Sequence, residues 1–291
     1  MVPYAAIGAG TIMTFAVTAA GGGLKYYPCR YGTSRVRFRG PRRDLKGDYV
    51  ACLGGTETYG LFVPQPFPRL LEDHVHLPCV NLGAINAGLD LFLDDAEVLN
   101  IARRARAVVI QITGAQNMSN RMYRVHPRRN DRFVQASEVL MTLFPEVDFT
   151  EFAFTRHMLG ALAGIDTHRF AMVVTELQEA WIARMTRLVG LLGQPPVLVW
   201  LARQPPPAET LPGMAVDDPL FITQPMIDRV AYRAARMMVL TASDHALSEG
   251  TRGLVYHASD TAAAEGQLGP RAHQDAARAL AQVLLPMVKD A

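Results

Sequence analysis

Five short apolar runs stand out in the hydrophobic pattern of the chain, and segments with helical spacing separate most of them. Runs of this length without polar alternation are typical of strands that are covered on both faces. Helical segments between strands predict parallel pairing, with helices on both sides of the sheet. The pattern therefore predicts an α/β fold, a three-layer sandwich with a five-stranded parallel sheet. The predicted strands span residues 50–54, 79–82, 108–113, 197–202 and 237–241.

The segment between the third and fourth predicted strands is unusually long. It spans residues 115–195 and predicts a helical insertion, in which the spacing of apolar residues marks three helices. Elsewhere, arginines alternate with apolar residues at 35–39, which predicts a short edge strand. The helices of the insertion are expected near 133–144, from 148 onward and over 168–192, and the others over 66–74, from 94, over 226–236 and from 270 onward.

The N-terminal stretch is uncharged from residue 2 to residue 24 and rich in glycine and alanine. Such a stretch is compatible with a signal or membrane segment, but no basic residue precedes its apolar part. We therefore expect residues 1–25 to be a poorly ordered extension, or the product of a start codon assigned too early. Residues 26–291 are expected to form a single domain.

Composition and charge exclude several function classes. The net charge of the 291-residue chain is only +2, which disfavours nucleic acid as a partner, and no nucleic-acid-binding motif is present. Three cysteines without a CxxC pair indicate neither a disulfide framework nor a zinc site, and they suit a reducing cytoplasm. The pair His74 and His76 has no further metal ligand at a telling spacing. We expect a cytoplasmic protein with no metal, no cofactor and no membrane contact.

The stretch from Val108 to Phe133 concentrates polar chemistry directly after a predicted strand. In open α/β sheets, ligands bind at the edge where the parallel strands end. A cluster of basic side chains there suits a small anionic or carbohydrate substrate, although arginines in a loop can also form a solvated surface. The amides and hydroxyls come first, at Gln116, Asn117, Ser119 and Asn120, and the basic cluster follows, at Arg121, Arg124, His126, Arg128, Arg129 and Arg132, opposed by Asp131.

Two further features place reactive side chains near strand or helix ends. The first predicted strand runs into Gly54-Gly55-Thr56-Glu57, and a strand that enters such a turn can expose a reactive side chain at its tip. The alternative is an ordinary tight turn, for which two glycines suffice. His273 lies in the first turn of the last predicted helix, where the helix N-terminus favours a neutral imidazole that can act as a base. The alternative is that His273 only packs there.

The order of these motifs resembles the SGNH (GDSL-like) hydrolase fold, a flavodoxin-like sandwich. Gly54-Gly55-Thr56 stands where this fold has its first block, Gly-Asp-Ser. Gly83 stands where it has the glycine of its second block. Gly114-Ala115-Gln116-Asn117 stands where it has its third block, Gly-x-Asn-Asp. His273 matches its last block. The resemblance covers residues 49–117 and 236–288. More narrowly, the GGTETYG and GAQNMSNR stretches resemble an uncharacterised bacterial family.

The resemblance implies an ester hydrolase or acyl transferase that acts on a small or carbohydrate-linked substrate. Thr56 would be the nucleophile and His273 the base, with Gly83 and Gln116 or Asn117 as oxyanion donors. Three departures bear on this activity. The nucleophile is threonine rather than serine. Pro270 occupies the position three residues before the histidine where the family has an acid, so Asp260 or Glu265 would have to supply the carboxylate. Gln116 stands where the family has asparagine.

A second hypothesis is a catalytically diverged domain that binds a phosphate, a sulfate or an acidic sugar. It would act as a group transferase or as a non-catalytic binder. The position of the Thr56 hydroxyl relative to His273 discriminates between the two hypotheses. The residues expected to contact the substrate in either case are Gly55, Glu57, Gly83, Gln116, Asn117, Asn120, Arg121, His126, Arg128 and Arg129.

Overall fold

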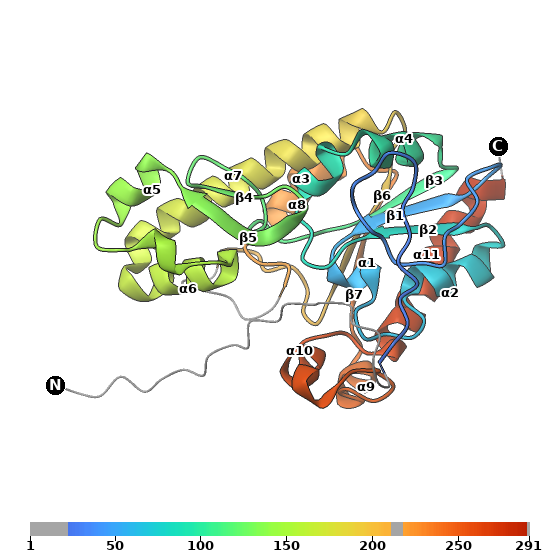
Figure 1. Cartoon of the computed structure of the whole chain (residues 1–291). Coiled ribbons are helices and arrows are strands. Elements are labelled where there is room, and N and C mark those ends of the chain that lie inside the picture. The colour runs from blue at the N-terminus through green and yellow to red at the C-terminus, as the bar shows by residue number, and fades with distance from the viewer. Residues whose placement is uncertain (1–22, 211–217, 290–291) are drawn as a thin grey trace.

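A computed structural model describes residues 23–210 and 218–289 (Figure 1). A central sheet separates two layers of helices, and a lobe formed by the hairpin β4–β5 with α5 and α6 extends to one side of these layers. Residues 1–22, which make up most of the expected N-terminal extension, lie outside the described residues. In the part of the chain that the structure describes, no helix is long and apolar enough to cross a membrane.

The sheet has five parallel strands among the described residues, in the order β2-β1-β3-β6-β7. In sequence order of these strands this is 2-1-3-4-5, the flavodoxin-like arrangement. The predicted α/β fold with a five-stranded parallel sheet is therefore confirmed, with bounds that differ by at most two residues. The strands are β1 (Val50–Gly54), β2 (Cys79–Gly83), β3 (Ala107–Gln111), β6 (Val197–Ala202) and β7 (Arg236–Thr241), and a separate antiparallel hairpin is formed by β4 (Tyr123–His126) and β5 (Arg129–Ala136).

Helices cover both faces of the sheet, which explains why the central strands show no polar alternation. On one face α2 and α11 pack on Val50, Cys52 and Val109, and on the other α3, α4, α7 and α8 pack on Ala51 and Ile110. The helices are α1 (Thr56–Tyr59), α2 (Phe67–Val75), α3 (Leu89–Leu93), α4 (Ala96–Arg104), α5 (Glu138–Leu143), α6 (Thr155–Ile165), α7 (Thr167–Leu191), α8 (Gln224–Ala231), α9 (Asp244–Ser248), α10 (Thr261–Glu265) and α11 (Pro270–Lys289), with 3-10 turns at Phe149–Glu151 and Ala258–Asp260.

Side-chain caps fix where several helices begin. Asp95 accepts hydrogen bonds from the amides of Glu97 and Val98 and so starts α4, one residue after the expected start at 94. Asp166 caps the long helix α7 in the same way. The helix expected from 148 is split, because Asp148 caps only a short 3-10 turn and α6 begins at Thr155.

The insertion between β3 and β6 contains a hairpin in addition to the predicted helices. Residues 129–136 form strand β5, and the helix expected near 133–144 is reduced to α5, which begins after its cap, Ser137. Phe133 therefore packs from a strand, and not from a helix. The expected edge strand at 35–39 is reduced to a single antiparallel bridge between Cys29 and Phe38.

Candidate functional site

The polar residues of interest lie at the carboxyl ends of β1 and β3, where the strand order of the sheet reverses direction. In parallel α/β sheets this switch point is the usual ligand site, because the connections on its two sides diverge and leave a crevice. Thr56 follows β1, and Thr113 to Asn117 follow β3. The chain therefore brings both predicted polar motifs to one edge of the sheet.

A buried glutamine fixes the turn that presents Thr56. The Gln111 Oε1 atom accepts hydrogen bonds from the amides of Gly55 and Thr58, both at 3.0 Å, and from the Thr58 hydroxyl at 2.7 Å. The turn is also sterically tight, because a Cβ atom at Gly54 would lie 2.1 Å from the Thr58 hydroxyl oxygen. Gly54 thus allows β1 to enter α1 in close contact with Gln111.

The Thr56 hydroxyl is half-buried and bonds to Asn86 from the loop after β2. Its oxygen accepts the Asn86 amide at 3.0 Å and lies 3.3 Å from the Asn86 side-chain oxygen. The Asn86 side-chain nitrogen in turn donates to Asp131 of β5 at 3.3 Å. A chain of polar groups therefore connects the tip of β1 to the hairpin that carries the basic cluster.

The amide that faces Thr56 belongs to Asn86, and not to Gly83. The Gly83 amide donates to the Asn81 side chain at 2.9 Å, so its hydrogen is already used. Asn86 has a φ of 53°, a conformation that asparagine adopts more readily than most residues. The sequence signal that indicates this contact is the turn Asn86-Ala87-Gly88 after the second predicted strand, and the predicted site did not include it.

The end of β3 supplies buried amide and hydroxyl groups. Asn117 donates to the Asn86 carbonyl at 2.9 Å and accepts from the Thr155 hydroxyl at 2.7 Å. Gln116 donates to Asp218 at 3.1 Å. Its side-chain oxygen, like the Thr113 hydroxyl, is buried without a hydrogen-bond partner among the described residues. A ligand hydroxyl or a water molecule would satisfy such groups.

The structure does not bring His273 to Thr56. The imidazole is fully buried, its Nδ1 atom accepts the Phe67 amide at 3.2 Å, and its Nε2 atom lies 3.4 Å from the Glu57 carboxylate. Because Nδ1 accepts a hydrogen bond, we assign the proton of the neutral ring to Nε2. The Nε2 atom has no hydrogen-bond partner among the described residues, and the hydrogen bonds of the Thr56 hydroxyl are to Asn86 rather than to His273.

The basic cluster is spread over the hairpin and does not converge on one point. Arg121 is 82% exposed and pairs with Glu176, and this pairing raises the Arg121 pKa. Arg124 donates to Gln135, and the Arg132 guanidinium lies 4.1 Å from the centre of the Phe154 ring. Asn120 accepts the amides of Met122 and Tyr123, so its side chain shapes the turn before β4.

The turn of the hairpin contains the remaining residues that were predicted to contact the substrate. Arg128 and Arg129 are exposed, and His126 is half-buried and accepts the Arg128 amide. The buried Asn130 holds this turn by accepting the Gly88 amide at 2.9 Å and donating to the His126 carbonyl at 3.1 Å. Arg128 and Arg129 therefore lie at the exposed turn of the hairpin, and Asp131 follows two residues after Arg129.

Comparison with known proteins assigns the chain to a family. A family model described as a domain of unknown function (DUF6473) matches residues 13–288. The chain belongs to the DUF6473 family. No curated protein matches this DUF6473 chain. Among solved structures, it is similar to the lipase Lip_vut3 from a goat rumen metagenome, at 10% identity and a TM-score of 0.39, over 80% of this chain and 96% of that one.

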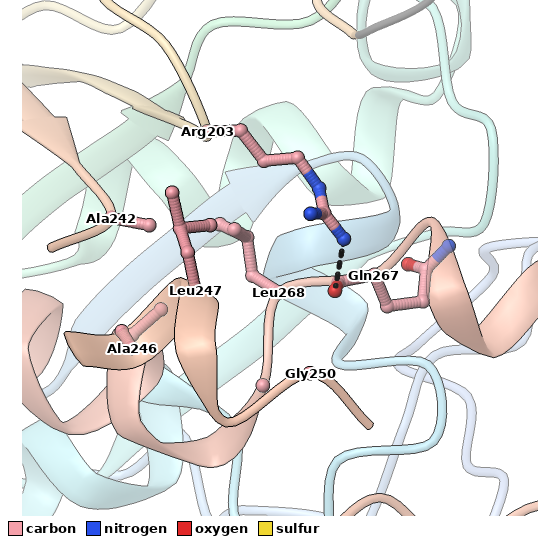
Figure 2. A pocket seen from close by; sticks show the side chains of 9 residues that line it. Arg203, Ala242, Ala246, Leu247, Gly250, Gln267 and Leu268 are labelled. Carbon is pink, nitrogen blue, oxygen red and sulfur yellow. Dashed lines mark hydrogen bonds between the residues drawn. The ribbon is translucent and has the colours of Figure 1, made fainter. Parts of the chain in front are cut away.

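Two other candidate sites of the DUF6473 chain, a metal site and a cavity before α11, do not suit a ligand. In residues 23–210 and 218–289, no three His, Cys, Asp or Glu side chains lie together as metal ligands would, so His74 and His76 gain no third partner. Figure 2 shows a cavity beside Leu268 before α11, bordered by Arg203, Leu247 and Gln267. Its volume of about 10 Å³ suits one water molecule rather than a substrate.

Proposed function

We propose that this protein is an SGNH-like α/β protein that binds a small acidic sugar or a similar hydroxylated anion at the carboxyl edge of its sheet. The flavodoxin-like strand order and the Gly54-Gly55-Thr56 turn at the switch point support this proposal. The Thr56 hydroxyl bonds to Asn86 and not to the buried His273, which favours ligand binding or group transfer over hydrolysis by a threonine–histidine pair.

The observation that carries the proposal is the contact from Thr56 through Asn86 to Asp131. It joins the strand-end hydroxyl to the hairpin that bears the arginines. Arg129 lies on β5 two residues before Asp131, where the pairing of the hairpin has a register shift. In the proposed site, one ligand contacts Thr56 and this arginine together.

The two ends of the site suit different parts of one ligand. Near Thr56, the Asp131 carboxylate is an acceptor that suits sugar hydroxyls as donors. At the hairpin turn, Arg128 and Arg129 suit a carboxylate, sulfate or phosphate, because a guanidinium binds such groups with two parallel hydrogen bonds. An acidic sugar carries both kinds of group.

Titration with glucuronate, measured by calorimetry and thermal shift, tests this proposal. We expect saturable binding that the double variant Arg128→Gln/Arg129→Gln weakens about tenfold or more, since a charge-assisted hydrogen bond is worth about 1.5–3 kcal/mol. Arg124→Gln serves as a matched control, because Arg124 lies on the same hairpin and bonds to Gln135. Equal weakening by both variants, or binding of neutral glucose with the same affinity, would contradict the proposal.

Acyl transfer or ester hydrolysis remains a second candidate, favoured by the Asn86 amide 3.0 Å from the Thr56 oxygen. That amide orients the Thr56 oxygen, which would attack the acyl carbon, while the negative charge would develop on the carbonyl oxygen of the substrate. Asp131 bonds to Asn86 and not to Thr56, and a neutral amide does not relay a proton, so Asp131 would replace His273 as the base through a water molecule between its carboxylate and the Thr56 hydroxyl.

A panel of acetylated sugars and p-nitrophenyl acetate tests this candidate. Removing a general base costs about 10²–10⁴-fold in rate, so we expect Thr56→Val and Asp131→Asn to lower kcat/KM by at least about a hundredfold. His273→Gln, which conserves the packing volume, should change kcat/KM far less. Activity that depends on His273 and is indifferent to Asp131 would contradict this assignment, and no turnover of any ester would exclude the candidate.

A further inference from the structure

A second cavity lies away from the strand-end site, between the N-terminal segment and the edge strand β2. Its volume is about 230 Å³, enough for a small ligand rather than a single water molecule. Segment 25–43 forms one wall, and the loop into α2 with Cys79 and Asn81 of β2 forms the other.

The lining of this cavity is strongly cationic. Among the described residues that line it, Lys25, Arg39, Arg43 and Arg69 carry positive charge and none carries a carboxylate. Two carboxylates stand outside the lining, where Glu72 bonds to the Arg43 Nε atom at 2.7 Å and Asp73 bonds to Arg69 at 2.6 Å. Lys25 and Arg39 have no carboxylate partner within the described chain, which leaves the cavity with a positive surplus.

Arg39 is the fixed part of this lining. It is 6% exposed, and its guanidinium donates to the backbone carbonyls of Tyr59, Gly60, Val63 and Pro64. Carbonyl dipoles satisfy its hydrogen bonds but do not neutralise its charge, and burial accordingly lowers the Arg39 pKa. A bound anion would supply the missing negative charge in a region where solvent screening is weak.

We propose that this cavity is a binding site for a phosphate group, either inorganic phosphate or the phosphate of a small monoester, separate from the strand-end site. Phosphate suits it because two or more cations surround a compact space, and Lys25, Arg43 and Arg69 have flexible side chains that can turn toward one anion. The proposal does not depend on the proposed function, since the two sites share no lining residue.

The cavity and the strand-end site lie at opposite ends of α1. Arg39 and Asn81 bond to the carbonyls of Thr58, Tyr59 and Gly60 at the end of this helix, whereas Thr56 begins it. Arg39 therefore places positive charge at the C-terminal end of α1, where the helix dipole favours it. Arg39 and Asn81, which line the cavity, thus also hold the helix that begins at Thr56.

Calorimetric titration of the full-length protein with inorganic phosphate tests the proposal, with glucose 6-phosphate and sulfate as further ligands at constant ionic strength. We expect saturable phosphate binding whose Kd rises about tenfold or more in Lys25→Gln/Arg69→Gln. Arg39 is left unchanged because its carbonyl bonds hold the fold. Tighter binding of glucose 6-phosphate than of inorganic phosphate would identify a monoester as the ligand, and the reverse would identify free phosphate.

Three titration results would overturn the proposal. The first is the absence of saturable phosphate binding, and the second is phosphate binding that Lys25→Gln/Arg69→Gln leaves unchanged. The third is loss of phosphate binding in Arg128→Gln/Arg129→Gln, which would assign the phosphate to the hairpin. Chemical acetylation followed by peptide mass analysis tests the site without variants. Phosphate should protect the exposed Lys25 from acetylation and should leave Lys289, at the end of α11, equally reactive. Equal acetylation of Lys25 with and without phosphate would contradict the site.

Discussion

Replacing Gln111 by leucine is expected to lower the free energy of unfolding by about 3–5 kcal/mol. The substitution keeps the side-chain volume but removes the acceptor of three buried donors, the amides of Gly55 and Thr58 and the Thr58 hydroxyl. Each buried donor left without a partner costs about 1–3 kcal/mol. Since a domain of this kind is stable by only about 5–15 kcal/mol, the loss is a large fraction of the total.

Chemical denaturation measures this effect, and Gln135→Leu provides the control. Gln135 also uses its side-chain oxygen as an acceptor, but on an exposed strand where water replaces the lost bond. We expect a change within about 0.5 kcal/mol for this control. If Gln111→Leu were as stable as the wild type, the turn that presents Thr56 would not depend on the glutamine, and our description of the site would be wrong.

Gly88→Ala is expected to destabilise the protein by about 3 kcal/mol and to weaken ligand binding at the strand-end site. A Cβ atom at Gly88 would lie 1.6 Å from the Asn117 carbonyl oxygen, a backbone atom that cannot rotate away. Relief of this clash must separate the loop after β2 from the loop after β3, since overpacking costs about 1–3 kcal/mol even where side chains can adjust. The same movement displaces Asn86, which bonds to Thr56.

Gly160→Ala is the matched control for this variant. Gly160 lies inside helix α6, and no atom stands within 4 Å of an added Cβ. Because alanine is the better helix former, we expect a gain of about 0.5–1 kcal/mol. Thermal and urea denaturation of both variants, with glucuronate titration of Gly88→Ala, measures the contrast. Equal stability of the two variants would contradict the close approach of the two loops.

The central strands were predictable from the sequence because they are covered on both faces. Val50–Gly54 and Val197–Ala202 are entirely buried and contain no polar position that could confuse strand with helix. The hairpin was not predictable on this basis. Its buried positions include the polar Asn130, and Phe133 with Leu140 happens to match a helical spacing, so its strand character was hidden.

The site was predictable as a place in the fold, but not as a set of contacts. The motif order located Thr56, Gln116 and Asn117 at the strand ends, where the structure has them. It also located His273 in the first turn of the last helix, but the ring turns toward Phe67 and Glu57. Side-chain direction depends on tertiary packing between elements far apart in the chain, and that information is not present in local spacing.

The positions of the charged side chains were also only partly predictable from the sequence. The sequence indicates one basic patch from Arg121 to Arg132, yet Arg121 pairs with Glu176 and Arg124 bonds to Gln135. Arg39 reads as one more arginine on an exposed face, but it is buried against carbonyls. The alternation at 35–38 does hold, with Val36 and Phe38 buried, and it fails only where the chain meets α1.

A crystal structure of the protein soaked with glucuronate tests the central claim most directly, namely that the strand-end residues and the hairpin turn form one ligand site. We predict density in which sugar hydroxyls contact Thr56 or Asp131 and the carboxylate contacts Arg128 or Arg129. Density confined to the cavity lined by Lys25 and Arg69, or no density near Thr56 at concentrations well above the measured Kd, would contradict the claim.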